Sequence, residues 1–122
     1  MGRSPAPSIA TNRPISELKA ELFRALAHPA RIRVLELLSE GEQSVSDMVP
    51  IVGIESSHLS QQLGGLRRAG LVTTRRQGTT VFYAIRDPLL VDLLVTAKRM
   101  LLNSLAESQG LLADLRAAVD DR

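Results

Sequence analysis

Residues 54–86, IESSHLSQQLGGLRRAGLVTTRRQGTTVFYAIR, decide the fold, because the spacing of the apolar side chains changes within them. Three leucines in the first half recur at the spacing of one helix face, which predicts a helix over residues 54–69. β-Branched and aromatic residues then flank a tight turn at Gly78, which predicts a two-stranded β-hairpin over residues 71–85. An isolated hairpin is only marginally stable in water, so this one must pack against helices.

The chain before this stretch predicts three further helices. An apolar stripe predicts a helix over residues 15–27, which ends where Pro29 begins a second helix that runs to Gly41. Ser44 is a suitable cap for a third, short helix. Gly53 ends that helix and forms a tight turn into the next one, which is the arrangement of a helix-turn-helix motif.

A long apolar helix follows the hairpin and begins near Pro88. Gly110 is expected to interrupt it. We therefore predict a mainly α fold with a small β-hairpin wing, a winged helix-turn-helix in the order α-α-α-α-β-β-α. Its parts are a flexible N-terminal arm over residues 1–14, the winged-helix domain over residues 15–105, and a C-terminal helical extension or tail over residues 106–122.

The composition narrows the classes of function. The chain has 122 residues, a net charge of +2 and no cysteine, which excludes disulfides and thiolate metal sites. Residues 54–86 hold five arginines against one glutamate, which is typical either of a DNA-binding surface or of a solvated basic face. The sequence lacks a cysteine nucleophile, a His–acid pair at motif spacing and a glycine-rich phosphate loop, so we expect no enzyme. No apolar run approaches the ~20 residues that cross a membrane, and we expect a cytoplasmic protein.

The helix-turn-helix gives the basic segment a function. In this motif the second helix enters the major groove of DNA. Here that helix, residues 54–69, carries small polar and amide side chains near its N-terminus, and these can hydrogen-bond base edges. Arginines follow at its C-terminal end and in the hairpin, where phosphates would lie. The predicted partner is therefore double-stranded DNA.

Two long motifs and their spacing resemble the ArsR/SmtB repressors. The run LAHPARIRVLELL, residues 26–38, resembles the second-helix signature of that family, and SHLSQQLGGLRRAGLV, residues 57–72, is similar to its recognition helix. Residues 75–78 and Tyr83 match the wing, and the resemblance covers about residues 15–105. It implies a homodimer, built on the first and last helices, that represses transcription from an inverted-repeat operator in promoter DNA and releases DNA when an effector binds.

The resemblance also implies which residues form the site. The residues that contact bases are Ser56, Ser57, Ser60 and Gln61, and those that hold phosphates are Gln62, Arg67, Arg75, Arg76 and Gln77; His58 and Arg68 complete the DNA-binding set. Ser56 or Ser57 could instead cap the helix, whereas the wing arginines have no evident packing role. The dimer interface comprises Leu18, Leu22, Leu90, Leu94, Ala97, Leu101 and Leu105.

The chain departs from the metal-sensing members of that family. It has no cysteine, and its last helix has no histidine. Its two histidines, His28 and His58, are not clustered with other ligands, so we predict neither a metal site nor another cofactor. The identity of any effector stays open. Two alternatives also remain, a metal-sensing repressor with carboxylate or histidine ligands, and a winged-helix module that binds a protein rather than specific DNA.

Overall fold

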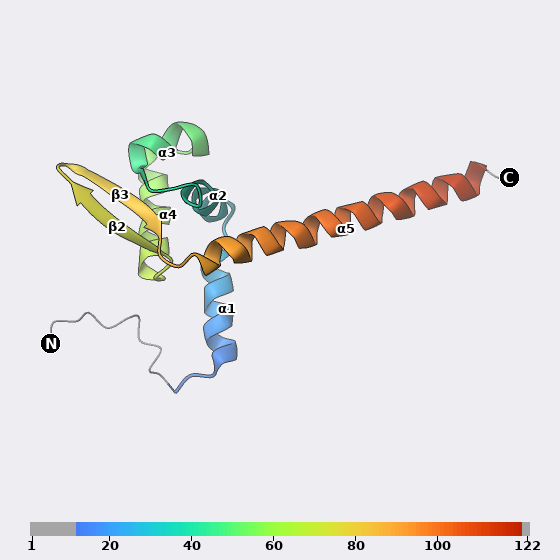
Figure 1. Cartoon of the computed structure of the whole chain (residues 1–122), viewed down its shortest axis with the longest axis horizontal. Helices are drawn as coiled ribbons and strands as arrows, with labels where there is room; N and C mark the ends of the chain where they lie inside the picture. Colours follow the sequence, from blue (N-terminus) through green and yellow to red (C-terminus); the bar gives the residue numbers. More distant parts are fainter. Residues whose placement is uncertain (1–11, 121–122) are drawn as a thin grey trace. The chain divides into compact units, whose positions relative to one another are not determined.

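The structure is a computed structural model that describes residues 12–120. Helices and short strands follow one another as Figure 1 shows: α1 (Ile15–Leu26), α2 (Pro29–Leu38), β1 (Gln43–Ser44), α3 (Val45–Val52), α4 (Ser56–Arg68), β2 (Val72–Gln77), β3 (Thr80–Ile85) and α5 (Leu89–Asp120). Contacts divide the chain into two units, Met1–Pro88 and Leu89–Arg122. The predicted fold class, mainly α with a β-hairpin wing, is confirmed. Residues 1–11 of the predicted arm lie outside the described residues.

Local signals set the ends of the first three helices. Pro29 is the first residue of α2, and His28 before it is extended, with φ −139° and ψ 119°. Ser44 caps α3 in a capping box, because its hydroxyl accepts a hydrogen bond from the Asp47 amide while the Asp47 carboxylate accepts one from the Ser44 amide. Gly53 ends α3 with φ 77°, a left-handed conformation that glycine adopts without strain.

The core of the first unit lies between α2, α3 and α4. The three leucines of α4 that the periodicity placed on one face are fully buried, which confirms that prediction. They pack with residues from α2, α3 and the base of the wing, each at most 3% exposed: Val34, Leu35, Leu38, Met48, Val52 and Val72. Burial of one face of α4 fixes which side of the helix remains in solvent.

The sheet has three strands rather than the two that the sequence predicts. It is antiparallel throughout, in the order β1-β3-β2. The additional strand pairs Gln43 with Tyr83 and Ser44 with Phe82. A strand of two residues is too short to show any alternation in the sequence, and Ser44 carries the signal of a helix cap instead. The hairpin of β2 and β3 projects beyond the helices of this unit (Figure 1).

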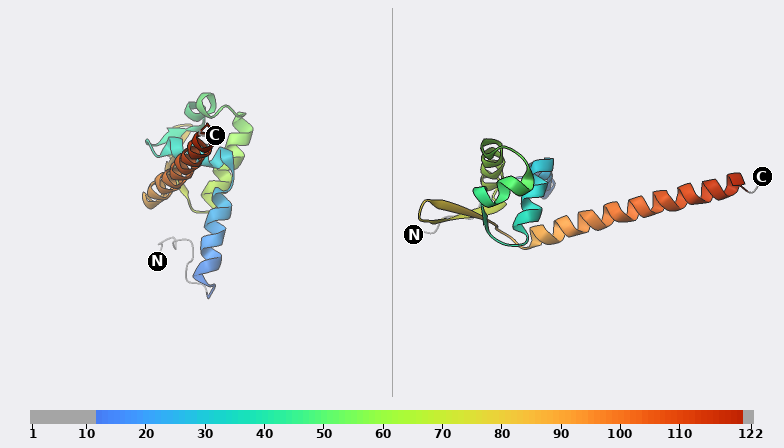
Figure 2. Two further views of the ribbon diagram at one scale, coloured as in Figure 1. Left: turned by 90° about the vertical axis from the view of Figure 1, so that its right-hand side faces the viewer. Right: turned by 90° about the horizontal axis from the view of Figure 1, so that it is seen from above.

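The second unit is α5, a single helix of 32 residues. The predicted interruption at Gly110 is wrong, because the helix runs through this residue without a break (Figure 2). A glycine costs about 1 kcal/mol relative to alanine in a helix interior, and the leucines and alanines around Gly110 favour helix strongly enough to tolerate it. Despite its length, α5 is not apolar enough to cross a membrane, and neither is any other helix in the described residues.

Candidate nucleic-acid interface

The solvent-facing side of α4 presents the polar residues that the sequence predicts as base readers. Ser56, Ser57, Ser60 and Gln61 are all exposed, as is His58. The leucines between them are buried, so the helix has one apolar face on the core and one polar face outside. The polar face carries hydroxyl, amide and imidazole groups, each able to donate and accept hydrogen bonds.

The alternative that a serine caps α4 is wrong. The residue at the cap is Glu55, in an extended conformation with φ −62° and ψ 148°, and no side chain caps the helix. Ser56 and Ser57 are the first two helical residues, and neither hydroxyl has a hydrogen-bond partner among residues 12–119. Both side chains are therefore available to a ligand at the N-terminal end of α4.

Gln62 occupies the boundary between this polar face and the core. It is half-buried, and its Oε1 accepts a hydrogen bond of 2.8 Å from Nε of Arg31 on α2. The Arg31 guanidinium also donates from Nη1 to the carbonyl of Ala25 over 3.1 Å. The amide nitrogen of Gln62 has no hydrogen-bond partner among the described residues, so it keeps both hydrogens to donate. Sequence reasoning missed this contact, because Arg31 and Gln62 are 31 residues apart and no periodicity relates them.

Two arginines close the last turn of α4. Arg67 and Arg68 are both exposed. Cations are favoured at this end of a helix, where the backbone carbonyls concentrate partial negative charge. Neither guanidinium forms an ion pair with any side chain in the described residues, so both charges are available to an anion.

The wing arginines differ from each other. Arg75 lies opposite Phe82 in the antiparallel register and Arg76 lies opposite Val81. Successive side chains of a strand point to opposite faces of the sheet. The two adjacent arginines therefore lie on opposite faces of the wing, although the sequence suggests one continuous basic patch.

Arg75 has a packing role that sequence reasoning missed. Its Nε donates to Oε2 of Glu42 over 3.0 Å, and its Nη2 donates to Oε1 of the same carboxylate over 2.5 Å. Nη1 donates to Oε1 of Gln77 over 3.0 Å, and the guanidinium lies 4.8 Å from the centroid of the Phe82 ring. Hydrogen bonding lowers the pKa of Glu42 and raises that of Arg75.

Arg76 is exposed and has no ion pair or hydrogen bond to any described side chain. Gln77 is the last residue of β2, and the turn that follows uses Gly78 with φ 63°. The unpaired positive charge of the wing therefore resides on Arg76, next to the tip of the hairpin.

Comparison with known proteins agrees with this geometry. The family model described as bacterial regulatory protein, arsR family, matches residues 28–74, from the start of α2 into β2. The chain is 51% identical over 105 residues to Rv0081, an uncharacterized HTH-type transcriptional regulator of Mycobacterium tuberculosis, and the match covers 85% of this chain and 92% of that protein. The chain belongs to the ArsR family.

Solved structures extend the likeness of this ArsR-family chain to its fold. The crystal structure of Rv0081 matches with a TM-score of 0.72 at 50% identity, over 79% of this chain and 97% of that one. The solution NMR structure of Mb0332 from Mycobacterium bovis, a homodimeric winged helix-turn-helix DNA-binding domain, matches with a TM-score of 0.65 at 27% identity, over 82% of this chain and 89% of that one. The family consists of transcriptional regulators, a non-enzymatic class.

A named repressor is also among the relatives. The biofilm growth-associated repressor of Agrobacterium fabrum is 44% identical over 68 residues, which cover 56% of this chain and 58% of that protein.

The residues predicted for a dimer interface differ in exposure in the single chain. Leu18 and Leu22 of α1 are half-buried. On α5, Leu90 is buried and Leu94 is half-buried, whereas Ala97 is exposed and Leu101 and Leu105 are 66% and 58% exposed. Several further apolar side chains of α5 are exposed: Met100, Leu102, Leu111, Leu112, Leu115 and Val119.

Metal-ligating groups do not converge in the part of this ArsR-family chain that the structure describes. No three histidine, aspartate or glutamate side chains there come together as a set that could hold an ion.

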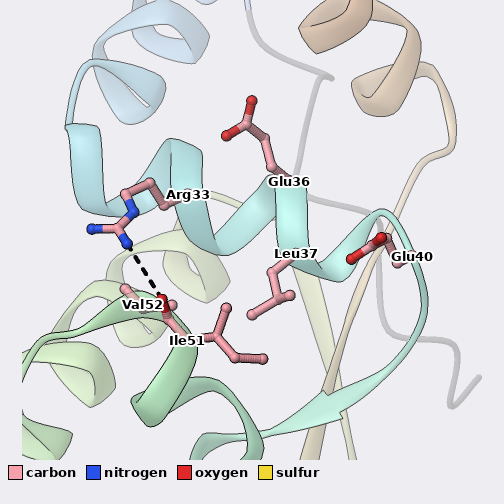
Figure 3. Close-up of a pocket in the computed structure, with 6 residues that line it drawn as sticks. All are labelled: Arg33, Glu36, Leu37, Glu40, Ile51 and Val52. Carbon is pink, nitrogen blue, oxygen red and sulfur yellow. Dashed lines mark hydrogen bonds between the residues drawn. The ribbon is translucent and has the colours of Figure 1, made fainter.

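A hollow of about 340 Å³ lies between α2 and α3, with Arg33 donating from Nη2 to the Ile51 carbonyl over 3.3 Å at one side (Figure 3). Charged and apolar residues line it together: Arg33, Glu36, Leu37, Glu40, Ile51 and Val52.

Proposed function

We propose that this chain is a homodimeric transcriptional repressor that places α4 in the major groove of an inverted-repeat operator. One observation carries the proposal: α4 buries its leucines completely and presents an uninterrupted polar face with two arginines at its end. The major groove is about 12 Å wide and admits a helix. A helix that packs one face on the core and presents a polar face to solvent can insert that polar face into the groove.

The base-reading role belongs to the N-terminal half of α4. Ser56, Ser57, Ser60 and Gln61 are exposed and free to reach base edges. A glutamine can donate to and accept from adenine at once, which makes Gln61 the strongest specificity determinant of the four. His58 lies in the same turn and adds a further donor or acceptor.

The phosphate-binding role belongs to the residues that flank this half. Arg67 and Arg68 end the helix, and Arg76 and Gln77 lie near the tip of the wing. Gln62, half-buried at the edge of the polar face of α4, adds an amide donor. Phosphate contacts of this kind fix register and orientation without reading sequence. The free guanidinium of Arg76 makes it the charged phosphate ligand of the wing.

Dimerisation explains the apolar surface of α5. Leu101 and Leu105 are more than half exposed in the single chain, and large exposed apolar side chains that follow one another along a helix are typical of an interface. The proposed dimer interface also includes apolar residues of α1 and of the first turns of α5: Leu18, Leu22, Leu90, Leu94 and Ala97. Mb0332, which shares the fold, is homodimeric. A two-fold symmetric dimer requires two inverted half-sites.

The biofilm growth-associated repressor, a relative of this chain, supports repression, and we infer that the operator overlaps a promoter. Such a protein acts in the cytoplasm, where the bacterial chromosome lies.

Selection of genomic DNA fragments by the purified protein, followed by sequencing, tests the proposal. We expect an inverted repeat whose half-sites lie about one helical turn apart. Reporter expression from a promoter that contains this repeat should fall when the protein is supplied. If no sequence rises above background, the basic surface serves a protein partner or non-specific binding, and the specific repressor is excluded.

A further inference from the structure

Three side chains form a row across the wing sheet. Glu42 immediately precedes β1, Phe82 lies on the central strand β3, and Arg75 lies on β2. Ser44 pairs with Phe82, and Phe82 pairs with Arg75. Glu42 lies two residues before Ser44, so it is offset along the sheet from the pair of Phe82 and Arg75. Its hydrogen bonds to Arg75 place it on the same face, diagonally across Phe82. The row therefore links the outer strands of the sheet over the middle one.

The contacts within this row hold the Arg75 guanidinium from three sides. The Glu42 carboxylate accepts from both Nε and Nη2, a two-point contact that fixes the plane of the guanidinium. Gln77 accepts from Nη1, and the Phe82 ring lies beneath. All three nitrogens of Arg75 thus donate within the chain, and its charge is matched by that of Glu42.

The neighbouring arginine has none of these contacts. Arg76 lies on the opposite face of the wing, is exposed, and has no acidic partner among the described side chains. The two adjacent arginines of the wing therefore differ. Arg75 is held in place by its contacts, whereas the charge of Arg76 has no partner among the described side chains.

We propose that Glu42 is a positioning residue of the DNA interface, which holds Arg75 across the sheet and thereby fixes the wing so that Arg76 meets the phosphate backbone. This inference rests on the proposed DNA-binding function. It assigns Arg75 a positioning role and leaves the phosphate to Arg76. It also means that an acidic residue strengthens the binding of a polyanion.

The direction in which one substitution changes the affinity for DNA distinguishes this role from simple electrostatics. Loss of a negative charge near DNA should by itself strengthen binding. If Glu42 positions the wing, Glu42→Ala instead weakens binding, by about three-fold for an exposed pair of this kind. Glu40→Ala is the matched control. Glu40 is two residues before Glu42 and carries the same charge, but its side chain does not contact Arg75. We expect its affinity to be unchanged or slightly tighter.

Arg75→Lys gives a second, independent test. Lysine keeps the charge and binds phosphate well, but it lacks the planar fork that contacts Glu42 at two points. We expect Arg75→Lys to weaken binding by about the same three-fold, and the double variant with Glu42→Ala to be no weaker than either single one, because both changes remove one interaction. If Arg75 held a phosphate itself, Arg75→Lys would bind nearly as well as the unmodified chain.

The measurement is the Kd of the full chain for a fluorescein-labelled random-sequence duplex of about 30 base pairs, roughly three helical turns, as a function of salt. Arg76→Ala should lower the slope of log affinity against log salt by about 1.8, because it removes one phosphate contact, worth about 0.9, from each protomer of the dimer. Thermal unfolding of each variant verifies the fold. If Glu42→Ala binds as tightly as Glu40→Ala or more tightly, the positioning role is overturned and DNA binding stands. If the unmodified chain does not bind the duplex, the proposed function itself fails, and the positioning role fails with it.

Discussion

Arg31 of α2 and Gln62 of α4 are joined by a hydrogen bond of 2.8 Å from Nε to Oε1, directly behind the polar face of α4. The same guanidinium reaches the carbonyl of Ala25 at the end of α1. It also passes Gly65, where the absence of a side chain leaves room for it. One arginine therefore ties α4 to the two helices before it, and the orientation of α4 depends on a residue outside the helix-turn-helix.

The two adjacent glycines of α4 should respond oppositely to alanine. A Cβ on Gly65 would lie 2.8 Å from Cζ of Arg31, so Gly65→Ala forces Arg31 aside and should destabilise the fold by about 1–3 kcal/mol. A Cβ on Gly64 meets only Nη1 of the exposed Arg68 at 3.2 Å, and that flexible side chain can move away. Gly64→Ala should then stabilise the fold by about 0.5–1 kcal/mol through helix propensity. Urea unfolding measures both, and equal effects would contradict the close passage of Arg31.

Gln62→Glu should move stability and DNA binding in opposite directions. A carboxylate at this position accepts a charge-assisted hydrogen bond from Arg31, which should stabilise the fold by about 0.5–1 kcal/mol. It also removes an amide donor and adds a negative charge beside the proposed phosphate, so the Kd for duplex DNA should rise roughly ten-fold at low salt. Urea unfolding and fluorescence anisotropy on the same preparation test the pair of effects. An unchanged Kd would show that Gln62 has only a structural role.

The sequence predicted those parts of the site that follow from periodicity and turn chemistry. Leu59 and Leu63 at helical spacing identify the buried face of α4, and therefore its exposed face as well. Gly53 and Gly78 mark turns because left-handed backbone favours glycine. Each of these signals is local, and the structure confirms each of them.

The parts that were missed depend on contacts between residues far apart in the chain. Arg75 reaches Glu42, 33 residues earlier, and Arg31 reaches Gln62, 31 residues later. Neither pair has a spacing that a helix or strand would repeat, so no pattern in the sequence identifies it. The same holds for the short strand β1, which exists because β3 offers it a partner. Charge counting alone therefore treated two different wing arginines as equivalent.

Gln61→Ala should relax sequence preference more than it weakens binding. A glutamine that donates to and accepts from one base contributes about 1–3 kcal/mol of discrimination at that base pair. Selection with randomised operators should show one position per half-site losing its preference, while affinity for random duplex is unchanged. Gln109→Ala on α5 is the control and should leave the selected sequences as they are. If all positions keep their preference, Gln61 does not contact a base.

The pair of Glu42 with Arg75 should give a defined pH dependence. Hydrogen bonds from Arg75 hold the pKa of Glu42 below its ordinary value of 4.5. A carboxyl group whose folded-state pKa is depressed contributes stability above its unfolded pKa and loses that contribution as pH falls through the folded value. The difference in Tm between the unmodified chain and Glu42→Ala should thus be constant from about pH 5 to 8 and shrink below about pH 4.5. Glu40→Ala should show no such trend, and a difference that persists to about pH 2 would contradict the pairing.

Leu101→Glu should separate the dimer without unfolding the chain. Leu101 is 66% exposed in the single chain, so a charge there does not disturb the fold, whereas burial of that charge between two copies is costly. The mass from light scattering should fall to that of one chain. Affinity for a fragment with two half-sites should fall on the order of 100-fold, because the second half-site no longer binds intramolecularly. Asn103→Glu is the matched control, since position 103 lies on the polar side of α5 about 200° around the helix from Leu101, and it should remain dimeric. A Leu101→Glu protein that keeps the mass of a dimer would show that the interface lies away from this part of α5.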